Sequence, residues 1–406
     1  MMEAPGKRKR GNEGGGYLSG DQDRLSALPD SLLREIMSHM KARQVVQTCV
    51  LSRRWRHLWR SMTCVDVNQA EFSTAGACQY SDHDGWEKFE DFMDILLSPG
   101  NVNIALLDTL RLHTSYGGCG LRDTRQRSRW IRRGIKYPHA QDLGVPRGRL
   151  SYNSWRLRRL HLSYLYLCNL FAEHVRTRCR SLEDLQLSSC DCDFHAIASD
   201  SLKDLVLRCC KFKGLSEIAT PVLKCLSIES GRNSKDCLLV ITAPALASVF
   251  LGVTPYNFNG GLSLSEKTTV SLAKASMRLA DNKIVDRFKM LGSSISNVIT
   301  NLEVSLPQTM NCDLSDDFQI LGHFLRNSPS LERLTLRRCK YSNDTKKKKG
   351  APKSKNPCPD LVDVPCENLK LTEIIYQEDD IHQLIELLLR ISGNLPNNCI
   401  KLIKVG

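Results

Sequence analysis

Apolar and polar residues alternate with two different periods along the chain. Between residues 28 and 62 the apolar positions have helical spacing and fall in three groups: Leu32, Leu33, Ile36, Met37 and Met40; then Val45, Val46, Cys49 and Val50; then Trp55, Leu58 and Trp59. The spacing i, i+3, i+4 is typical of amphipathic helices. We therefore expect three short helices over residues 24–62, with Pro29 in the first turn and Ser52 capping the third.

From residue 104 the pattern changes to Leu-x-x-Leu-x-Leu, which recurs to near the C-terminus. The clearest units start at Leu157, Leu182, Leu202, Leu223 and Leu246, with spacings of 25, 20, 21 and 23 residues. Further units start at Leu107 and Leu331, and weaker ones lie near Leu272 and Ile299. Leucine-rich repeats recur every ~20–29 residues and bury their strands only by stacking. We predict an α/β fold, with a three-helix head followed by a horseshoe-shaped solenoid whose parallel strands line the concave face.

Other segments separate and follow these two patterns. An amphipathic helix is predicted from Trp86 to Leu97, a last strand from Leu369 to Tyr376 and a last helix from Asp380 to Ile391. The changes of pattern divide the chain into a disordered Gly-rich basic tail (1–22), the helical head (23–62), a linker that caps the array (63–103), the repeats (104–342), a disordered Lys- and Pro-rich insertion (343–366) and a C-terminal strand and helix (367–406).

The head resembles a known family. Leu28-Pro29-x-x-Leu32-Leu33-x-x-Ile36, followed by Val50-Leu51-Ser52-x-x-Trp55-x-x-Leu58-Trp59, closely resembles the F-box motif of plant F-box proteins with leucine-rich repeats. Both halves match at the family's spacing without a gap. The C-terminal region, 367–406, resembles the FBD-type region of the same family, which suggests a cap on the solenoid.

The resemblance implies an F-box that binds a Skp-type adaptor and, through it, a cullin–RING ubiquitin ligase, the SCF complex. The adaptor contacts carried over from the motif are Leu28, Pro29, Leu32, Ile36, Leu51, Ser52, Trp55 and Trp59. The repeats would hold an unknown target protein, and the chain would be a non-catalytic receptor subunit without a cofactor. A non-ligase F-box scaffold is the alternative.

The energetics of the head agree with an interaction role. A unit of under ~40 residues rarely folds alone, yet this one carries about ten large apolar side chains, each contributing ~1.5–3 kcal/mol when buried. Some of these side chains must therefore pack outside the unit, either on the repeats that follow or on a partner protein.

Charge and cysteine content add to the picture. The 406 residues carry a formal charge of +13 and 17 cysteines, with no apolar leader and no C-x-x-C pair. We expect reduced, mostly buried thiols in the nucleus or cytoplasm. Cys190, Cys210 and Cys339 end Leu-x-x-Leu-x-Leu-x-x-Cys units, where the side chain would cap backbone groups. Cys209, close to Arg208, is the one candidate for a reactive thiol.

Basic clusters suggest two further hypotheses. The first cluster consists of Lys7, Arg8, Lys9 and Arg10, a candidate nuclear-import signal in a tail that could also be simply solvated. The second, residues 122–136, includes Trp130 and could contact phosphates and stack on a base. A helix here would turn Trp130 inward, so nucleic acid is not the expected partner.

Other kinds of site find little support in the sequence. No catalytic motif and no apolar run of membrane-spanning length occurs. His83 and Asp84 are expected to be solvated rather than to bind a metal ion. The residues between the repeat leucines, such as Asp204 and Val206, change in charge from unit to unit, which fits either a recognition surface or surface positions that simply drift.

Overall fold

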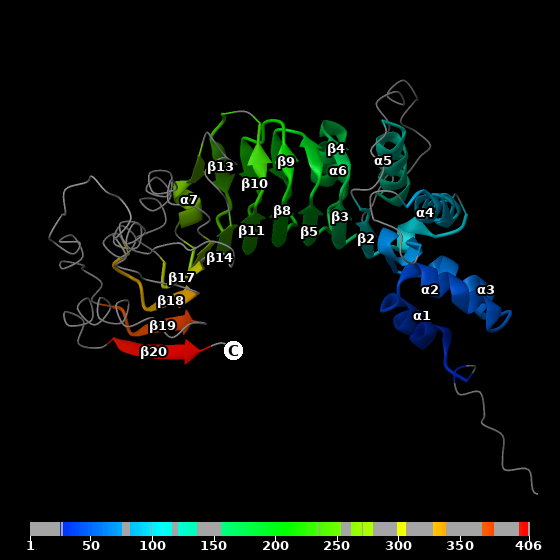
Figure 1. Ribbon diagram of the computed structural model, residues 1–406, viewed down its shortest axis with the longest axis horizontal. Helices are drawn as coiled ribbons and strands as arrows, with labels where there is room; N and C mark the ends of the chain where they lie inside the picture. Colours follow the sequence, from blue (N-terminus) through cyan, green and yellow to red (C-terminus); the bar gives the residue numbers. More distant parts are fainter. Residues whose placement is uncertain are drawn as a thin grey trace, which may run out of the picture.

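A computed structural model gives the architecture of the chain. It describes residue 25 and residues 27–74, 82–98, 100–115, 121–135, 156–234, 236–252, 261–269, 271–278, 299–305, 328–337, 368–376 and 398–404. Over these residues the fold is mixed α/β: a small helical region at the N-terminus is followed by a large parallel sheet (Figure 1). This arrangement is consistent with a leucine-rich-repeat solenoid.

The head contains the three expected helices, each of them short. They are α1 (Asp30–Ser38), α2 (Ala42–Gln47) and α3 (Trp55–Leu58), with the 3-10 turns η1 (Thr48–Val50) and η2 (Trp59–Ser61). Pro29 precedes α1, and its carbonyl oxygen accepts hydrogen bonds from the backbone N–H of Leu32 and Leu33 at 3.0 and 3.2 Å. Its missing N–H therefore costs the helix nothing.

Twelve strands form one parallel sheet. In sheet order they are β1 (Cys64–Asn68), β2 (Thr109–His113), β3 (Arg159–Ser163), β5 (Asp184–Ser188), β8 (Asp204–Arg208), β11 (Cys225–Glu229), β14 (Ser248–Gly252), β16 (Lys274–Arg278), β17 (Asn301–Ser305), β18 (Arg333–Arg337), β19 (Leu371–Tyr376) and β20 (Cys399–Lys404). The order follows the sequence, so each repeat stacks on the previous one. The sheet begins at β1, within the stretch predicted to be a linker and cap.

The register places the repeat leucines in continuous rows. Leu160, Leu185 and Leu205 pair side by side, and all three are buried. The buried core runs without interruption from Leu33 in the head to Ile374 in β19. Head and repeats therefore share one hydrophobic core.

Two four-stranded parallel sheets form a second layer along the middle repeats (Figure 1). One contains β4 (Tyr166–Cys168), β6 (Asp191–Asp193), β9 (Lys211–Phe212) and β12 (Arg232–Asn233); the other contains β7 (Ala196–Ala198), β10 (Glu217–Ala219), β13 (Leu239–Thr242) and β15 (Leu262–Leu264). The 25-residue unit contributes β4 and also carries helix α6 (Asn169–Arg178), in the place where the later units have strands of the second small sheet. Units of 20–23 residues are too short to return through a ten-residue helix, so they return through short strands.

The remaining helical segments are η3 (Gln69–Phe72), α4 (His83–Leu96), η4 (Ile104–Leu106), α5 (Leu121–Ile135) and α7 (Glu266–Thr269). Helix α4 confirms the helix predicted from Trp86 to Leu97. Its residue Phe89 packs edge-on against Phe72 and against Trp130 of α5, with ring centroids 5.5 and 5.3 Å apart. This aromatic cluster closes the end of the core beside the head.

The chain leaves four successive strands through the same turn. Tyr164, Ser189, Cys209 and Ser230 have φ between 52° and 57°, and each follows the last residue of a strand. The N–H of each donates to the carbonyl of the next strand, for example from Ser189 to Arg208 at 2.7 Å. The hydrogen bond offsets the cost of about 1–2 kcal/mol that a left-handed conformation carries outside glycine.

The cysteines that follow these turns are structural. Cys190 and Cys210 are fully buried, and the Cys210 thiol donates to the Leu187 carbonyl oxygen at 3.2 Å. Burial raises the pKa of Cys190. Cys209 is exposed, but partial burial and the Glu229 carboxylate raise the pKa of its thiol. The raised pKa weighs against a reactive Cys209, because it lowers the fraction of thiolate that reactivity requires.

Several predictions concern residues outside the described ranges. These are the basic tail with Lys7 to Arg10, the insertion 343–366, Cys339, and the helix from Asp380 to Ile391. The predicted strand from Leu369 to Tyr376 is confirmed as β19, which begins at Leu371.

Candidate functional site

Exposed apolar side chains concentrate on the head. Among the described residues, ten large hydrophobic side chains are exposed, and five of them belong to the head: Leu25, Leu32, Ile36, Val50 and Leu51. Val50 is 88% exposed and Leu51 58%. Monomeric proteins expose single apolar residues routinely, but a cluster on so small a unit indicates a surface for a partner. We call Leu32, Ile36, Val50 and Leu51 the head apolar face.

Helix α1 divides its apolar stripe between the core and this face. Leu33 and Met37 are fully buried, whereas their neighbours Leu32 and Ile36 remain 49% and 40% exposed. The stripe is wider than the surface that the repeats cover. The apolar side chains of the head therefore divide into a larger group that packs inward and a smaller group that faces solvent.

Polar bonds hold the two halves of the F-box motif together. Arg54 Nε donates to Asp30 Oδ1 at 2.6 Å, and an Arg54 guanidinium N–H donates to the Leu28 carbonyl oxygen at 2.6 Å. Ser52 Oγ accepts from the Trp55 N–H at 3.5 Å, as expected for a residue at the start of the third helix. Arg54 therefore fixes the position of Leu28 and α1.

The two tryptophans of the motif lie inside the head. Trp55 is 4% exposed and Trp59 8%, and both belong to the continuous core. Little of either indole is open to a partner, so in this structure they support the surface rather than form it. Leu28 is half-buried and packs against the same core, while Pro29 is exposed. Of the eight predicted contact residues, Leu32, Ile36 and Leu51 thus offer the most apolar surface.

Exposed arginines follow Leu51 in the sequence. They are Arg53, Arg56 and Arg60, all between two and nine residues beyond it. The Arg60 guanidinium lies 5.8 Å from the centroid of the Trp59 ring. A partner that covers Leu51 would therefore meet positive charge at the edge of the contact.

A buried carboxylate joins the head to the sheet. Asp66 in β1 accepts from Lys41 Nζ at 2.8 Å and lies 3.4 Å from the Arg111 guanidinium of β2. The Asp66 side chain is 12% exposed, so the two cations are needed to offset its desolvation. Backbone bonds continue the connection, since the Asn103 N–H donates to the Arg60 carbonyl at 2.9 Å. The head is thus fixed to the first two strands.

The second candidate surface is the open face of the large sheet. We use this name for the strand residues that alternate with the buried leucines. The carboxylates here pair with side chains of neighbouring strands: Asp184 with the His161 imidazole at 2.8 Å, Glu229 with Arg208 at 2.9 Å and Glu373 with Lys401 at 3.4 Å. These pairs neutralise much of the charge that the sequence shows between the leucines.

The structure weighs against the nucleic-acid hypothesis for residues 122–136. Trp130 is fully buried, and its indole N–H donates to Asp94 Oδ1 at 3.0 Å. Arg133 also bonds to Asp94, at 3.1 Å, and the Arg127 guanidinium lies 4.7 Å from the Trp86 ring centroid. The tryptophan cannot stack on a base, and these arginines have partners within the fold.

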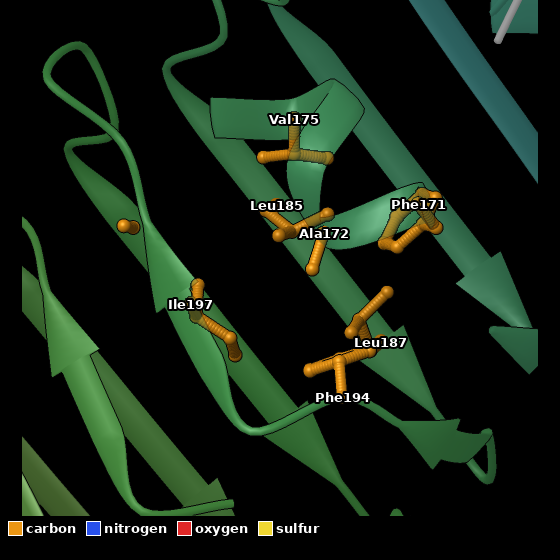
Figure 2. A pocket seen from close by; sticks show the side chains of 8 residues that line it. Phe171, Ala172, Val175, Leu185, Leu187, Phe194 and Ile197 are labelled. Atoms are coloured by element: carbon orange, nitrogen blue, oxygen red, sulfur yellow. The ribbon is translucent and has the colours of Figure 1, made fainter. Parts of the chain in front are cut away.

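A small pocket beside α6 is entirely apolar. Phe171, Ala172 and Val175 of α6 face Leu185 and Leu187 of β5, with Phe194 and Ile197 closing the other side (Figure 2). The volume open to the centre of a water-sized sphere is only about 10 Å³. This is at the lower limit for holding one water molecule. The pocket marks the change from a helical to a stranded second layer and is too small for a ligand.

Other kinds of site are absent from the part of the chain that the structure describes. No group of three or more His, Cys, Asp or Glu side chains there is placed to hold a metal ion; His83 and Asp84 form the exposed start of α4. Every helix in these ranges is too short or too polar to span a membrane.

Comparison with known proteins agrees with this geometry. The family model of the F-box domain matches residues 25–65. A meiotic F-box protein, MOF, of Oryza sativa subsp. japonica is 29% identical over 93% of this chain and 84% of its own length. Two F-box/FBD/LRR-repeat proteins of Arabidopsis thaliana, one named as putative, are 26% and 25% identical over 59% and 67% of this chain and 60% and 68% of their own lengths. Together, the domain match and these relatives support placing the chain in the plant F-box/leucine-rich-repeat family.

Proposed function

We propose that this chain is the substrate-recognition subunit of an SCF-type ubiquitin ligase. The head would bind a Skp-type adaptor, and the repeats, as a leucine-rich-repeat solenoid, would bind the target protein. The observation that carries the proposal is the head apolar face, because half of the exposed large hydrophobic side chains in the described residues lie on this small unit. Exposed apolar side chains gathered on a small unit are typical of a surface that binds a partner protein.

The mechanism is proximity rather than chemistry by this chain. The adaptor would link the head to the cullin and its ubiquitin-charged enzyme, and the sheet would hold the target beside them. The Asp66 pairs and the shared core support this role, because they fix the two binding surfaces relative to each other. The chain itself would be a non-catalytic receptor.

The adaptor contact can be tested with a matched control. Leu32→Arg together with Leu51→Arg places two charges on the head apolar face without touching the core. If each leucine contributes ~2 kcal/mol, as interface hot spots do, either substitution alone weakens binding about 30-fold. The control is Ile95→Arg on α4, since Ile95 is 63% exposed but lies outside the head.

The measurement is the affinity of the purified chain for a Skp-type adaptor, with circular dichroism to show that both variants fold. We expect the double variant to lose the adaptor and the cullin, and Ile95→Arg to keep them. Undiminished binding by the double variant would remove the proposal. Affinity purification with and without proteasome inhibition would then identify the target as a protein enriched only under inhibition.

Nuclear localisation is a separate proposal. Lys7 to Arg10 form a cluster that an import receptor would read as a row of positive charges. A fluorescent reporter fused to residues 1–22 should accumulate in the nucleus, whereas a fusion with the four residues changed to Ala should not. Equal distribution of the two reporters would show that the cluster is only solvated.

A further inference from the structure

The middle row of the open face changes from charged to neutral in the centre of the sheet. The strand register aligns its neutral members from β5 to β16: Gln186, Val206, Ser227, Phe250 and Ser276. The row is charged on both sides of this stretch, by Arg111 on β2 and by Glu303 on β17, and each of these makes an ion pair. The centre of the sheet is therefore the part of this row with the lowest cost of desolvation.

The side chains of the neutral stretch differ in size, so its surface is uneven. A Cβ atom on Gly252 would lie 3.1 Å from Phe250 Cε1, so the glycine leaves room for the ring to lie across it. Ser227 stands between Val206 and Phe250 in the register and is much smaller than either. Two larger apolar side chains thus flank a low position, and both are only half-buried.

At the centre of the stretch, from β8 to β14, the charge that has no ion-pair partner among the described residues has one sign, whereas on β16 the stretch is flanked by Lys274 and Arg278. On β8, β11 and β14 the charged residues of the open face are Asp204, Arg208 and Glu229. Arg208 and Glu229 neutralise each other at 2.9 Å. Asp204 is exposed and forms no ion pair with any residue that the structure describes. The uncompensated charge next to Val206 is therefore negative, although the whole chain is positive, and screening beyond ~8 Å makes the local sign decisive.

We propose that this stretch docks an extended segment of the target protein that carries one apolar and one basic side chain. The apolar side chain would pack over Ser227 between Val206 and Phe250, and a Lys or Arg would reach the Asp204 carboxylate. This inference rests on the proposed function, in which the sheet holds the target, and it adds the chemical class of the segment.

The geometry also gives the spacing of the two anchors. Asp204 and Ser227 lie on adjacent strands, two residues apart along the strand direction, which places their Cα atoms about 8 Å apart. An extended chain advances ~6.6–6.8 Å in two residues. The basic residue should therefore stand two or three positions from the apolar one.

The test is a display selection of random linear octapeptides on the full-length chain. Wild type should enrich peptides with an aliphatic or aromatic residue and a Lys or Arg two or three positions away. Asp204→Lys should change the selected charge from basic to acidic and weaken a wild-type peptide about tenfold. Ser227→Trp should abolish enrichment by filling the low position. Arg333→Glu, in the same row as Asp204 but five strands away, is the matched control and should leave the selection unchanged.

Three results would overturn the inference: no enrichment with wild type, enrichment without a charge preference, or a preference that Asp204→Lys leaves unchanged. Adaptor binding is measured on the same preparations. If the wild-type chain does not bind the adaptor, the proposed function is wrong. If it binds the adaptor but the peptide selection gives one of the three results above, only the docking site is wrong.

Discussion

Asp66 provides the sharpest test of how the head is attached to the repeats. Its carboxylate receives Lys41 from the start of α2 and Arg111 from β2, so one side chain connects head and sheet. Asp66→Asn keeps the size of the side chain and removes its charge. The two cations then lose the carboxylate that both of them contact.

The stability lost in Asp66→Asn depends on how well water solvates the charges of Lys41 and Arg111. Removing one partner of a fully buried ion pair costs ~3–5 kcal/mol. Here the Lys41 and Arg111 side chains are 41% and 31% exposed, so water can solvate part of the charge that Asp66 leaves behind. We expect a loss of about 2 kcal/mol, which is roughly a 30-fold increase in local opening. Lys41→Ala should lower the free energy of local opening by under ~1 kcal/mol, because the Lys41 side chain is more exposed than that of Arg111, which remains beside Asp66.

Hydrogen exchange measured by mass spectrometry resolves this prediction by segment. Exchange over residues 41–68 should accelerate about 30-fold in Asp66→Asn, while β8 and β11 keep their protection, since local opening is not global unfolding. Glu373→Gln is the control: its partner Lys401 is 59% exposed, so little local change is expected. Unchanged exchange over residues 41–68 would show that the core alone holds the head, and the reasoning on Asp66 would be refuted.

The remaining predictions concern the buried aromatic and histidine side chains. Trp55→Ala should lower the free energy of unfolding of the head by ~3–5 kcal/mol in urea titrations, whereas Leu51→Ala should cost under ~1 kcal/mol because its side chain is 58% exposed. Burial lowers the pKa of His174 to about 4, against 6.5 when unfolded. The unfolded chain thus binds the proton first, and up to about 3 kcal/mol of stability should be lost as the pH falls from 6.5 to 4. His174→Gln should flatten that part of the pH profile, and an NMR titration showing an ordinary pKa would contradict it.

The large sheet was predictable because its signal repeats. The three apolar residues of Leu-x-x-Leu-x-Leu, recurring every 20–25 residues, specify a strand, its buried face and its neighbour. The two small sheets gave no such signal, since strands of two to four residues are too short to show a clear alternation. The sequence alone shows only scattered apolar residues here, such as Phe194, Ile197, Phe212 and Ile218. In the folded repeats all four are buried. Strand β20 was missed for another reason: Cys399–Lys404 lacks the leucine spacing of the other units.

The candidate site was predictable in composition but not in geometry. The period of α1 identifies its apolar stripe, yet no period tells which half of a stripe a neighbouring sheet will cover. Trp55 and Trp59 match the residue types favoured at interfaces, but a unit this small needs its largest side chains for its own core. The Asp66 connection was invisible, because its partners lie 25 and 45 residues away in the sequence.

Because the head and the repeats share one core, the position of the docking site along the sheet sets its distance from the head. Phe250 lies on β14, six strands from β1, or about 29 Å along the sheet at ~4.8 Å per strand. Since the head cannot swing freely on Asp66 and the core, that separation is set by the number of repeats between them. A receptor that acts by proximity would then specify its target twice, through the side chains around Ser227 and through the distance at which they hold it. Deleting one of the 20–23-residue units between β5 and β14 would bring a bound target about one strand spacing, ~4.8 Å, closer to the head. The side chains of the head apolar face would stay the same.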